Sequence, residues 1–240
     1  MKFSIIIPTL NEEDNIAGCI QSISNQKPAY PFEVIIVDGG SSDGTLEKAR
    51  GLAGRTGDLF PVRIIETGTP GLARQLNLGS SVSSGRVLIF LHADNSLPKD
   101  AMDKIERLFN RDKRFVGGSF TMMLEGDRLY YRVSSFLGNL FSRMSRIYFG
   151  DKVIFVRRDV FEKLGGFREI PVMSDYDFSK KMKNAGRTVL LKGPTYTSPR
   201  GMKGPFWRRT YLIVWALFAF EKGVDPAIIR DRYYQGYSRK

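Results

Sequence analysis

Short apolar runs alternate with amphipathic segments over the first 125 residues of this 240-residue chain. Four runs have the length of strands, and the last is apolar throughout, as expected for a strand covered on both faces: 3–7, 32–37, 62–65 and 87–91. The segments between and after them place apolar residues at helical spacing and predict helices at 13–25, 44–53, 71–83 and 98–110. This alternation predicts an α/β fold with a mostly parallel central sheet and helices on both faces.

The rest of the chain is less regular. Its pattern predicts three further strands, at 115–124, 153–157 and 189–191. It also predicts helices at 129–147, 160–164, 175–184, 205–222 and 226–233, which make the C-terminal portion helical. There is no internal repeat and no linker long enough to divide the chain, so a single domain over 1–240 is the simplest organisation.

Composition excludes several classes of protein. The chain is 42% hydrophobic and 26% charged, which is ordinary for a globular protein and excludes general disorder. Its one cysteine, Cys19, cannot form an internal disulfide, so we expect a reducing compartment. The longest apolar run, 211–220, is far shorter than the roughly 20 residues that span a bilayer. We therefore expect the protein in the cytoplasm, either free or peripheral on the cytoplasmic face of the membrane.

The net charge of +12 is unevenly distributed. Residues 1–100 have 9 basic and 11 acidic side chains, a net of −2, so the remaining 28 basic and 14 acidic side chains give the rest of the chain +14. A basic surface suits nucleic acid, anionic lipid or a phosphorylated substrate, and the alternative is a surface whose charge only keeps the protein soluble. There is no motif that recognises RNA or DNA, so we expect no nucleic-acid partner.

Polar side chains follow each of the first four predicted strands. They lie in 8–12, 38–43, 66–74 and 92–94, and ligands of open parallel sheets bind beyond such strand ends. Most of these residues could equally cap helices or form turns. Asp94 is harder to explain in that way, because an acid at the end of an apolar strand needs a partner, for which Mg²⁺ or Mn²⁺ is suitable. His92 is the only histidine, and a lone histidine more often packs than binds a ligand.

A second acidic cluster, Ser174-Asp175-Tyr176-Asp177, begins a predicted helix. In one interpretation Ser174 caps the helix and the two aspartates interact favourably with the positive end of the helix dipole. In the other, Asp175 is a general base. Other enzyme classes lack their motifs here: there is no GxGxxG after the first strand, no GxxxxGK[ST], and no Cys/His cluster for zinc.

Six segments in this order resemble family-2 glycosyltransferases of the GT-A fold: IIIPTLNEEDNI, VIIVDGGSSDGT, GLARQLNLG, FLHADNSLP, GDKVIFVRRDVFEKLGGF and PVMSDYDFSKKMKNAG. The resemblance covers about residues 2–200 and is strongest to a bacterial subgroup with HAD where most relatives have DxD. Three positions depart from the usual pattern. His92 replaces the first Asp of DxD, Ser174 replaces a Glu, and SPRGMKGPFWRR stands where QxxRW is usual.

The resemblance implies a nucleotide-sugar site in 1–97, an acceptor and catalytic part in 98–200, and C-terminal helices in 201–240. It implies a UDP- or GDP-linked donor, a divalent cation (Mn²⁺ or Mg²⁺) held by Asp94, and inversion at the sugar. Asp175 would deprotonate the acceptor, with Gly150 and Asp151 on the acceptor side. The residues implied to line the donor are Pro8, Thr9, Asn11, Glu12, Asp38, Gly40, Arg74, His92, Ala93, Asp94 and Arg200.

Two other functions remain open at this stage. A sugar-1-phosphate nucleotidyltransferase would need a Gly-rich loop after the first strand, where Pro8-Thr9-Leu10-Asn11 stands instead. A non-catalytic basic module would bind a membrane through its charge. In 128–158, seven basic residues and one acid accompany an apolar helix. That helix either packs on the sheet, packs across a homodimer, or lies on anionic lipid, in which case the acceptor could be lipid-linked.

Overall fold

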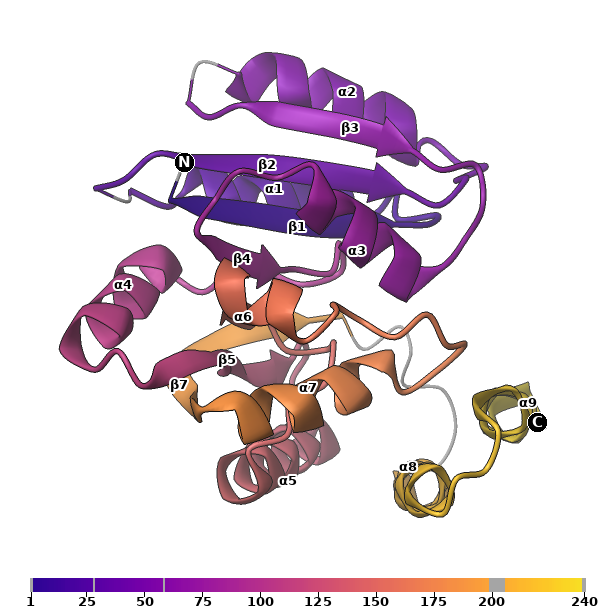
Figure 1. Cartoon of the computed structure of the whole chain (residues 1–240). Helices are drawn as coiled ribbons and strands as arrows, with labels where there is room; N and C mark the ends of the chain where they lie inside the picture. Colours follow the sequence, from indigo (N-terminus) through magenta and orange to yellow (C-terminus); the bar gives the residue numbers. More distant parts are fainter. Residues whose placement is uncertain (1, 28, 58, 199–205, 239–240) are drawn as a thin grey trace.

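The structure is a computed structural model that describes residues 2–27, 29–57, 59–198 and 206–238. Its centre is one seven-stranded sheet with the order β3-β2-β1-β4-β6-β5-β7 (Figure 1). The strands are β1 (Phe3–Thr9), β2 (Phe32–Asp38), β3 (Val62–Glu66), β4 (Val87–Phe90), β5 (Phe115–Leu124), β6 (Ile154–Arg157) and β7 (Arg187–Thr197). β6 is antiparallel to β4 and β5, and the other neighbours run parallel, so the predicted mostly parallel sheet is confirmed.

Helices cover both faces of this sheet. They are α1 (Ile16–Ser24), α2 (Thr45–Thr56), α3 (Leu72–Ser81), α4 (Ala101–Arg111), α5 (Leu129–Ser145), α6 (Arg158–Lys163), α7 (Ser174–Ala185), α8 (Phe206–Glu221) and α9 (Pro226–Ser238). One buried cluster joins the sheet to α1 and α4, and the other joins it to α3, α6 and α7. Helices α8 and α9 pack on each other at one end of the molecule, around Ala216, Ala219 and Ile229 (Figure 1).

The predicted strand 189–191 is too short, since β7 runs over eleven residues, from Arg187 to Thr197. The apolar pattern ends at Lys192-Gly193-Pro194, so the sequence predicts that the strand ends before these residues. In the structure Leu191 pairs with Phe120 and Thr195 with Met122, so the three residues between them form an irregularity that the strand continues past.

Helix α5 packs with its polar side inward. Ser135 and Ser142 are buried, whereas Phe136 and Met144 are 65% and 77% exposed. Of the three arrangements that the sequence leaves open for this helix, packing of its apolar side on the sheet is therefore wrong. Its contact to the sheet is made by hydrogen bonds to the backbone of β5, and the apolar residues are left on the outside.

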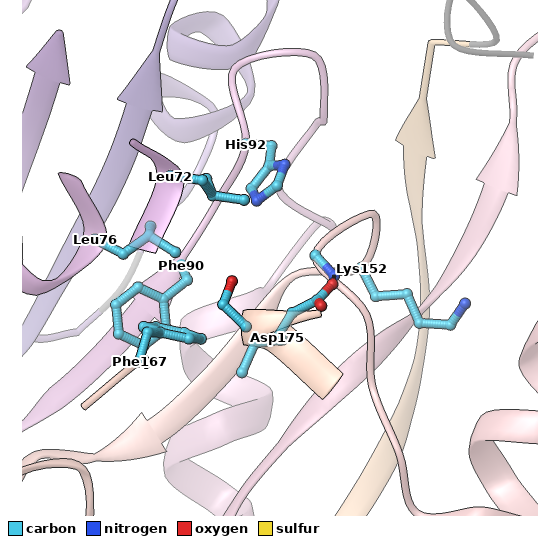
Figure 2. A pocket seen from close by; sticks show the side chains of 10 residues that line it. Leu72, Leu76, Phe90, His92, Lys152, Phe167 and Asp175 are labelled. Atoms are coloured by element: carbon cyan, nitrogen blue, oxygen red, sulfur yellow. Dashed lines mark hydrogen bonds between the residues drawn. The ribbon is translucent and has the colours of Figure 1, made fainter. Parts of the chain in front are cut away.

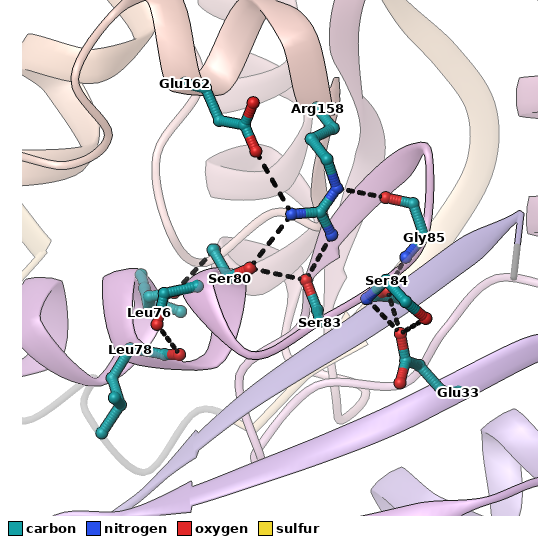
Figure 3. A network of polar contacts seen from close by, with 11 residues as sticks. Glu33, Leu76, Leu78, Ser80, Ser83, Ser84, Gly85, Arg158 and Glu162 are labelled. Carbon is teal, nitrogen blue, oxygen red and sulfur yellow. Dashed lines mark hydrogen bonds and ion pairs between the residues drawn. The ribbon is translucent and has the colours of Figure 1, made fainter.

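Arg158, the first residue of α6, ties three parts of the fold together (Figure 3). Its guanidinium donates to the carbonyl oxygens of Gly85 (2.6 Å) and Ser80 (3.2 Å) and to the Ser83 hydroxyl (2.5 Å). The next residue, Ser84, donates its N–H to the Glu33 carboxylate on β2 at 2.6 Å. The turn between α3 and β4 is thus held from both sides.

We expect Arg158→Ala to lower the free energy of unfolding by about 2–3 kcal/mol, because several hydrogen bonds to one charged group are lost and two carbonyls lose a partner. Urea unfolding followed by circular dichroism measures this. Glu162→Ala is the matched control, since it removes only an exposed ion pair to Arg158 and should cost less than about 0.5 kcal/mol. Equal losses in the two variants would contradict the assignment.

Candidate active site

The Asp38 carboxylate joins the ends of β1 and β2. It is fully buried, and one oxygen accepts from the hydroxyls of Thr9 (2.9 Å) and Ser41 (2.5 Å). The other oxygen accepts from the N–H groups of Gly40 (2.9 Å) and Ser41 (2.8 Å). Asp38 therefore shapes the loop after β2. Its implied contact with a base ring would require one of these bonds to open, and that role stays a prediction.

Asn11 connects the loops that follow β1 and β2. Its side-chain oxygen accepts from the N–H of Ser42 at 2.9 Å, and its own N–H donates to the Ser41 hydroxyl at 2.9 Å. The half-buried Glu12 donates its N–H to Thr45 at 2.7 Å and accepts from Asn15 at 2.7 Å. The structure thus brings Thr9, Asn11 and Glu12 together at one rim, as the strand-end argument predicts.

Gln75 is a residue of this rim that sequence reasoning missed. It is buried, and its amide donates to the carbonyl oxygens of Thr9 (2.9 Å) and Val37 (2.7 Å), which fixes α3 to the ends of β1 and β2. A polar residue on the apolar side of the predicted helix was the available signal. The neighbouring Arg74 is exposed and donates to Thr69 at 3.1 Å.

Gly40 and Gly68 approach each other closely where the loops after β2 and β3 meet. Gly40 has a φ of +93°, and a side chain there would lie 3.1 Å from the carbonyl oxygen of Gly68. The predicted site residue Gly40 is thus required by the backbone, whatever else it contacts.

The second half of the site is built around Asp175, in the first turn of α7. One carboxylate oxygen accepts the N–H of Gly150 at 2.6 Å, and the other accepts the N–H of Tyr176 at 2.7 Å. Burial raises the pKa of the Asp175 carboxyl above its ordinary value, and these two N–H groups act in the opposite direction. A carboxylate with a raised pKa is suited to proton transfer.

His92 lies on the other side of Gly150 from this carboxylate. A Cβ at Gly150 would lie 2.8 Å from the His92 ring and 3.4 Å from the Asp175 carboxylate, so any larger residue there would displace the His92 side chain. His92 is thus next to the candidate base, and its positive charge, when protonated, would lower the pKa of that base. The sequence did not predict this pairing.

Asp94 lies two residues further along the same loop. Its side chain is half-buried, and its carbonyl oxygen accepts from the N–H of Ser198 at 3.2 Å. The carbonyl oxygen of Asp151, an exposed residue, accepts from Asn95 (3.3 Å) and Thr197 (3.1 Å), which fixes the loop before β6 against the end of β7.

A small cavity opens between these two halves (Figure 2). The residues that line it are Leu72, Leu76, Phe90, His92, Gly150, Lys152, Ile154, Phe167, Ser174 and Asp175. Asn77 holds Phe167 in this wall. The side-chain amide of Asn77 donates to the carbonyl oxygen of Phe167 at 2.8 Å and accepts from the N–H of Phe167 at 2.9 Å. The preceding Gly165 and Gly166 both have positive φ, which explains the two glycines of the LGGF segment.

Two features limit what the site can hold by itself. Within the described residues there is no group of three or more His, Cys, Asp or Glu side chains that could enclose a metal ion. Arg200, which the resemblance implies to line the donor, lies outside the described residues. Pro8 and Ala93, which the resemblance implies to line the donor, are buried.

Comparison with known proteins gives one consistent result. The family model "Glycosyl transferase family 2" matches residues 4–174. Glycosyltransferase AglE of Haloferax volcanii is 31% identical over 192 residues, which cover 78% of this chain and 62% of that protein. A dolichol-phosphate mannosyltransferase of Pyrococcus furiosus is 33% identical over 122 residues, which cover 50% of this chain and 34% of that protein.

A solved structure has a similar fold. The mannosyltransferase PcManGT of Pyrobaculum calidifontis, in complex with GDP-Man and Mn²⁺, superposes with a TM-score of 0.69 at 22% identity. The match covers 97% of this chain and 69% of that one. The chain is therefore shorter than each of these proteins, and spans less than two thirds of the length of AglE.

We expect Asp38→Ala to lower the free energy of unfolding by about 3 kcal/mol, because four donors lose their acceptor inside the protein. The N–H groups of Gly40 and Ser41 should also exchange faster with solvent. Urea unfolding and amide hydrogen exchange measure the two effects. Asp14→Ala, at an exposed position before α1, is the control and should leave both unchanged; faster exchange in neither variant would argue that Asp38 does not organise the loop.

Proposed function

The chain belongs to glycosyl transferase family 2 and has the GT-A fold, and from this premise we propose that it transfers a sugar from a nucleoside-diphosphate donor to an acceptor hydroxyl. The observation that carries the proposal is the placement of Asp175. Its half-buried carboxylate is held by two backbone N–H groups at the rim where the parallel strands end.

We place the donor at residues 1–97, between the ends of β1, β2 and β4. Thr9, Asn11, Glu12 and Asp38 form the loops that would border the nucleoside, and Arg74 is the exposed cation at their edge. In open α/β sheets this is the place where nucleotides bind. UDP and GDP are both candidates for the nucleoside diphosphate.

We assign Asp94 as the protein's ligand to a divalent cation. The donor set fits an ion that the protein shares with its substrate, because one half-buried carboxylate leaves the other positions to diphosphate oxygens and water. When bound, Mn²⁺ or Mg²⁺ would offset the charge that develops on the departing nucleoside diphosphate. The mannosyltransferase PcManGT was solved with Mn²⁺ and its GDP-linked donor.

We assign Asp175 as the general base of an inverting transfer. Each of its oxygens accepts one N–H bond and keeps capacity for a hydroxyl proton. As that proton moves to Asp175, the acceptor oxygen bonds to the anomeric carbon while the carbon–oxygen bond to the diphosphate breaks, and the nucleoside diphosphate leaves with the electron pair. We assign His92, which lies beside Gly150, to the electrostatic environment of this carboxylate.

We propose a lipid-linked acceptor that presents a free hydroxyl, approaching from residues 98–200, where Gly150 and Asp151 border the base. A groove next to the residue that follows the base is walled by Phe141, Ile147 and Tyr176, and at its edge lie Lys183 and the ion pair of Lys180 with Glu221. Apolar walls near Lys183 suit such a molecule, and one relative is a dolichol-phosphate mannosyltransferase. Release of nucleoside diphosphate that depends on an added polyprenyl-linked sugar with free hydroxyls, and not on free sugars, would support this acceptor; the reverse would exclude it.

We expect Asp175→Asn to reduce sugar transfer by a factor of about 10² to 10⁴, the usual contribution of a general base, while nucleotide affinity changes little. Nucleoside diphosphate release measures transfer, and isothermal titration measures affinity. Asp177→Asn is the matched control, because that residue lies on the same helix but pairs with Lys181. Loss of transfer and affinity together would mean that Asp175 has a structural role.

The transfer rate should rise with pH through the pKa of Asp175, because only the deprotonated carboxylate can accept the proton. Since burial raises that pKa, the acid limb should lie above the ordinary aspartate value of about 3.9. A pH–rate profile tests this, and the limb should vanish from the residual activity of Asp175→Asn. A rate that is flat across this range would contradict the assignment.

UDP or GDP should raise the melting temperature, and Mn²⁺ should increase that shift in the wild-type protein. Asp94→Ala should abolish the Mn²⁺-dependent part, because the only assigned protein ligand is gone. Asp100→Ala, an exposed acid before α4, is the control. If neither nucleotide shifts the melting temperature, the proposed donor site is wrong.

A further inference from the structure

Helix α5 presents an apolar stripe to the outside of the molecule. Its exposed members recur at helical spacing along one side: Val133, Phe136, Leu137, Leu140, Phe141 and Met144. We call this set the α5 face. Contiguous exposed surface of this kind marks an interaction site more often than it marks ordinary protein surface.

The inner side of α5 explains why this orientation is fixed. Asn139 exchanges two hydrogen bonds with the backbone of Met122 on β5, at 2.9 and 3.0 Å. The Ser135 hydroxyl accepts the N–H of Leu124 at 3.0 Å. Rotating the helix to bury its apolar side would break these bonds and bury polar groups without partners, so the α5 face stays outside.

Arginines surround the α5 face. Arg128 and Arg146 are the residues at the two ends of the helix, and Arg132 and Arg143 are exposed within it. From 128 to 150 there is no acidic residue and no lysine. Apolar side chains beside cations with no counter-charge are the pattern of a helix that lies on anionic lipid.

A second apolar stripe lies at the same end of the molecule. In Figure 1, α5 and α8 both lie at the end opposite α2 and β3. Tyr211, Val214 and Phe218 of α8 are each more than half exposed, and Lys222 lies 5.5 Å from the Phe218 ring. No helix within the described ranges is long and apolar enough to cross a bilayer.

We propose that the α5 face docks the protein on an anionic lipid surface, with α5 lying in the plane of the interface. A symmetric contact between two copies through this face would bring the arginines of both copies together, and the repulsion would oppose association. Lipid headgroups instead supply the missing negative charge, and the acyl region receives Phe136 and Met144. The proposal is independent of which donor or acceptor the enzyme uses.

The test is flotation of the purified full chain with vesicles of phosphatidylcholine alone or mixed with phosphatidylglycerol. We expect binding to the mixed vesicles only. Phe136→Ser/Met144→Ser should weaken it at least about tenfold, because two exposed apolar side chains no longer enter the interface. Arg132→Gln/Arg143→Gln should weaken vesicle binding about fivefold per arginine. High salt should also weaken vesicle binding.

Leu59→Ser and Arg55→Gln are the matched controls, because both residues are exposed and lie at or just after α2, at the opposite end of the molecule. They should bind vesicles as the wild type does, and thermal shift by UDP or GDP should be the same in all variants. Absence of wild-type binding, or equal loss in the control and α5 variants, would overturn the proposal. A dimer in light scattering that Phe136→Ser/Met144→Ser dissociates would assign the face to a second copy instead.

Discussion

The direction of one strand determines how the candidate site is assembled. β6 runs antiparallel between β4 and β5, so it begins at the edge where the parallel strands end, with Ile154 opposite Phe90. The loop that enters β6 therefore delivers Gly150 beside His92, and its N–H points at the carboxylate of Asp175. With a parallel strand in this place, that loop would lie at the far edge of the sheet. Donor-side and base-side residues meet because of this one reversal.

Much of this arrangement could be predicted from the sequence, because strand ends in a parallel sheet share an edge. Thr9, Asn11 and Glu12 are found together for this reason. The pairing of His92 with Asp175 could not be predicted, since it depends on the antiparallel direction of β6 and on the absence of a side chain at Gly150. Neither property has a signature in local hydrophobic periodicity.

The orientation of α5 shows a different limit of sequence analysis. Periodicity reveals that a helix has an apolar side, but the direction of that side depends on partners elsewhere in the chain. Here Asn139 satisfies the backbone of β5 next to the irregularity that separates Phe120 from Met122. The same irregularity lengthens β7 beyond its predicted end. Both the orientation of α5 and the full length of β7 thus depend on contacts between distant parts of the chain, which local periodicity does not contain.

The attachment of α5 also assigns folding and surface contact to different residues of one helix. Folding depends on Asn139 and Ser135, which bond to main-chain atoms and are indifferent to the side chains of β5. The outward positions contribute little to the stability of the monomer. Their side chains can therefore be substituted to suit a different binding surface without unfolding the protein. A transferase built in this way can change its working environment by substitutions on the outside of one helix, with no compensating change in the sheet or in the donor site.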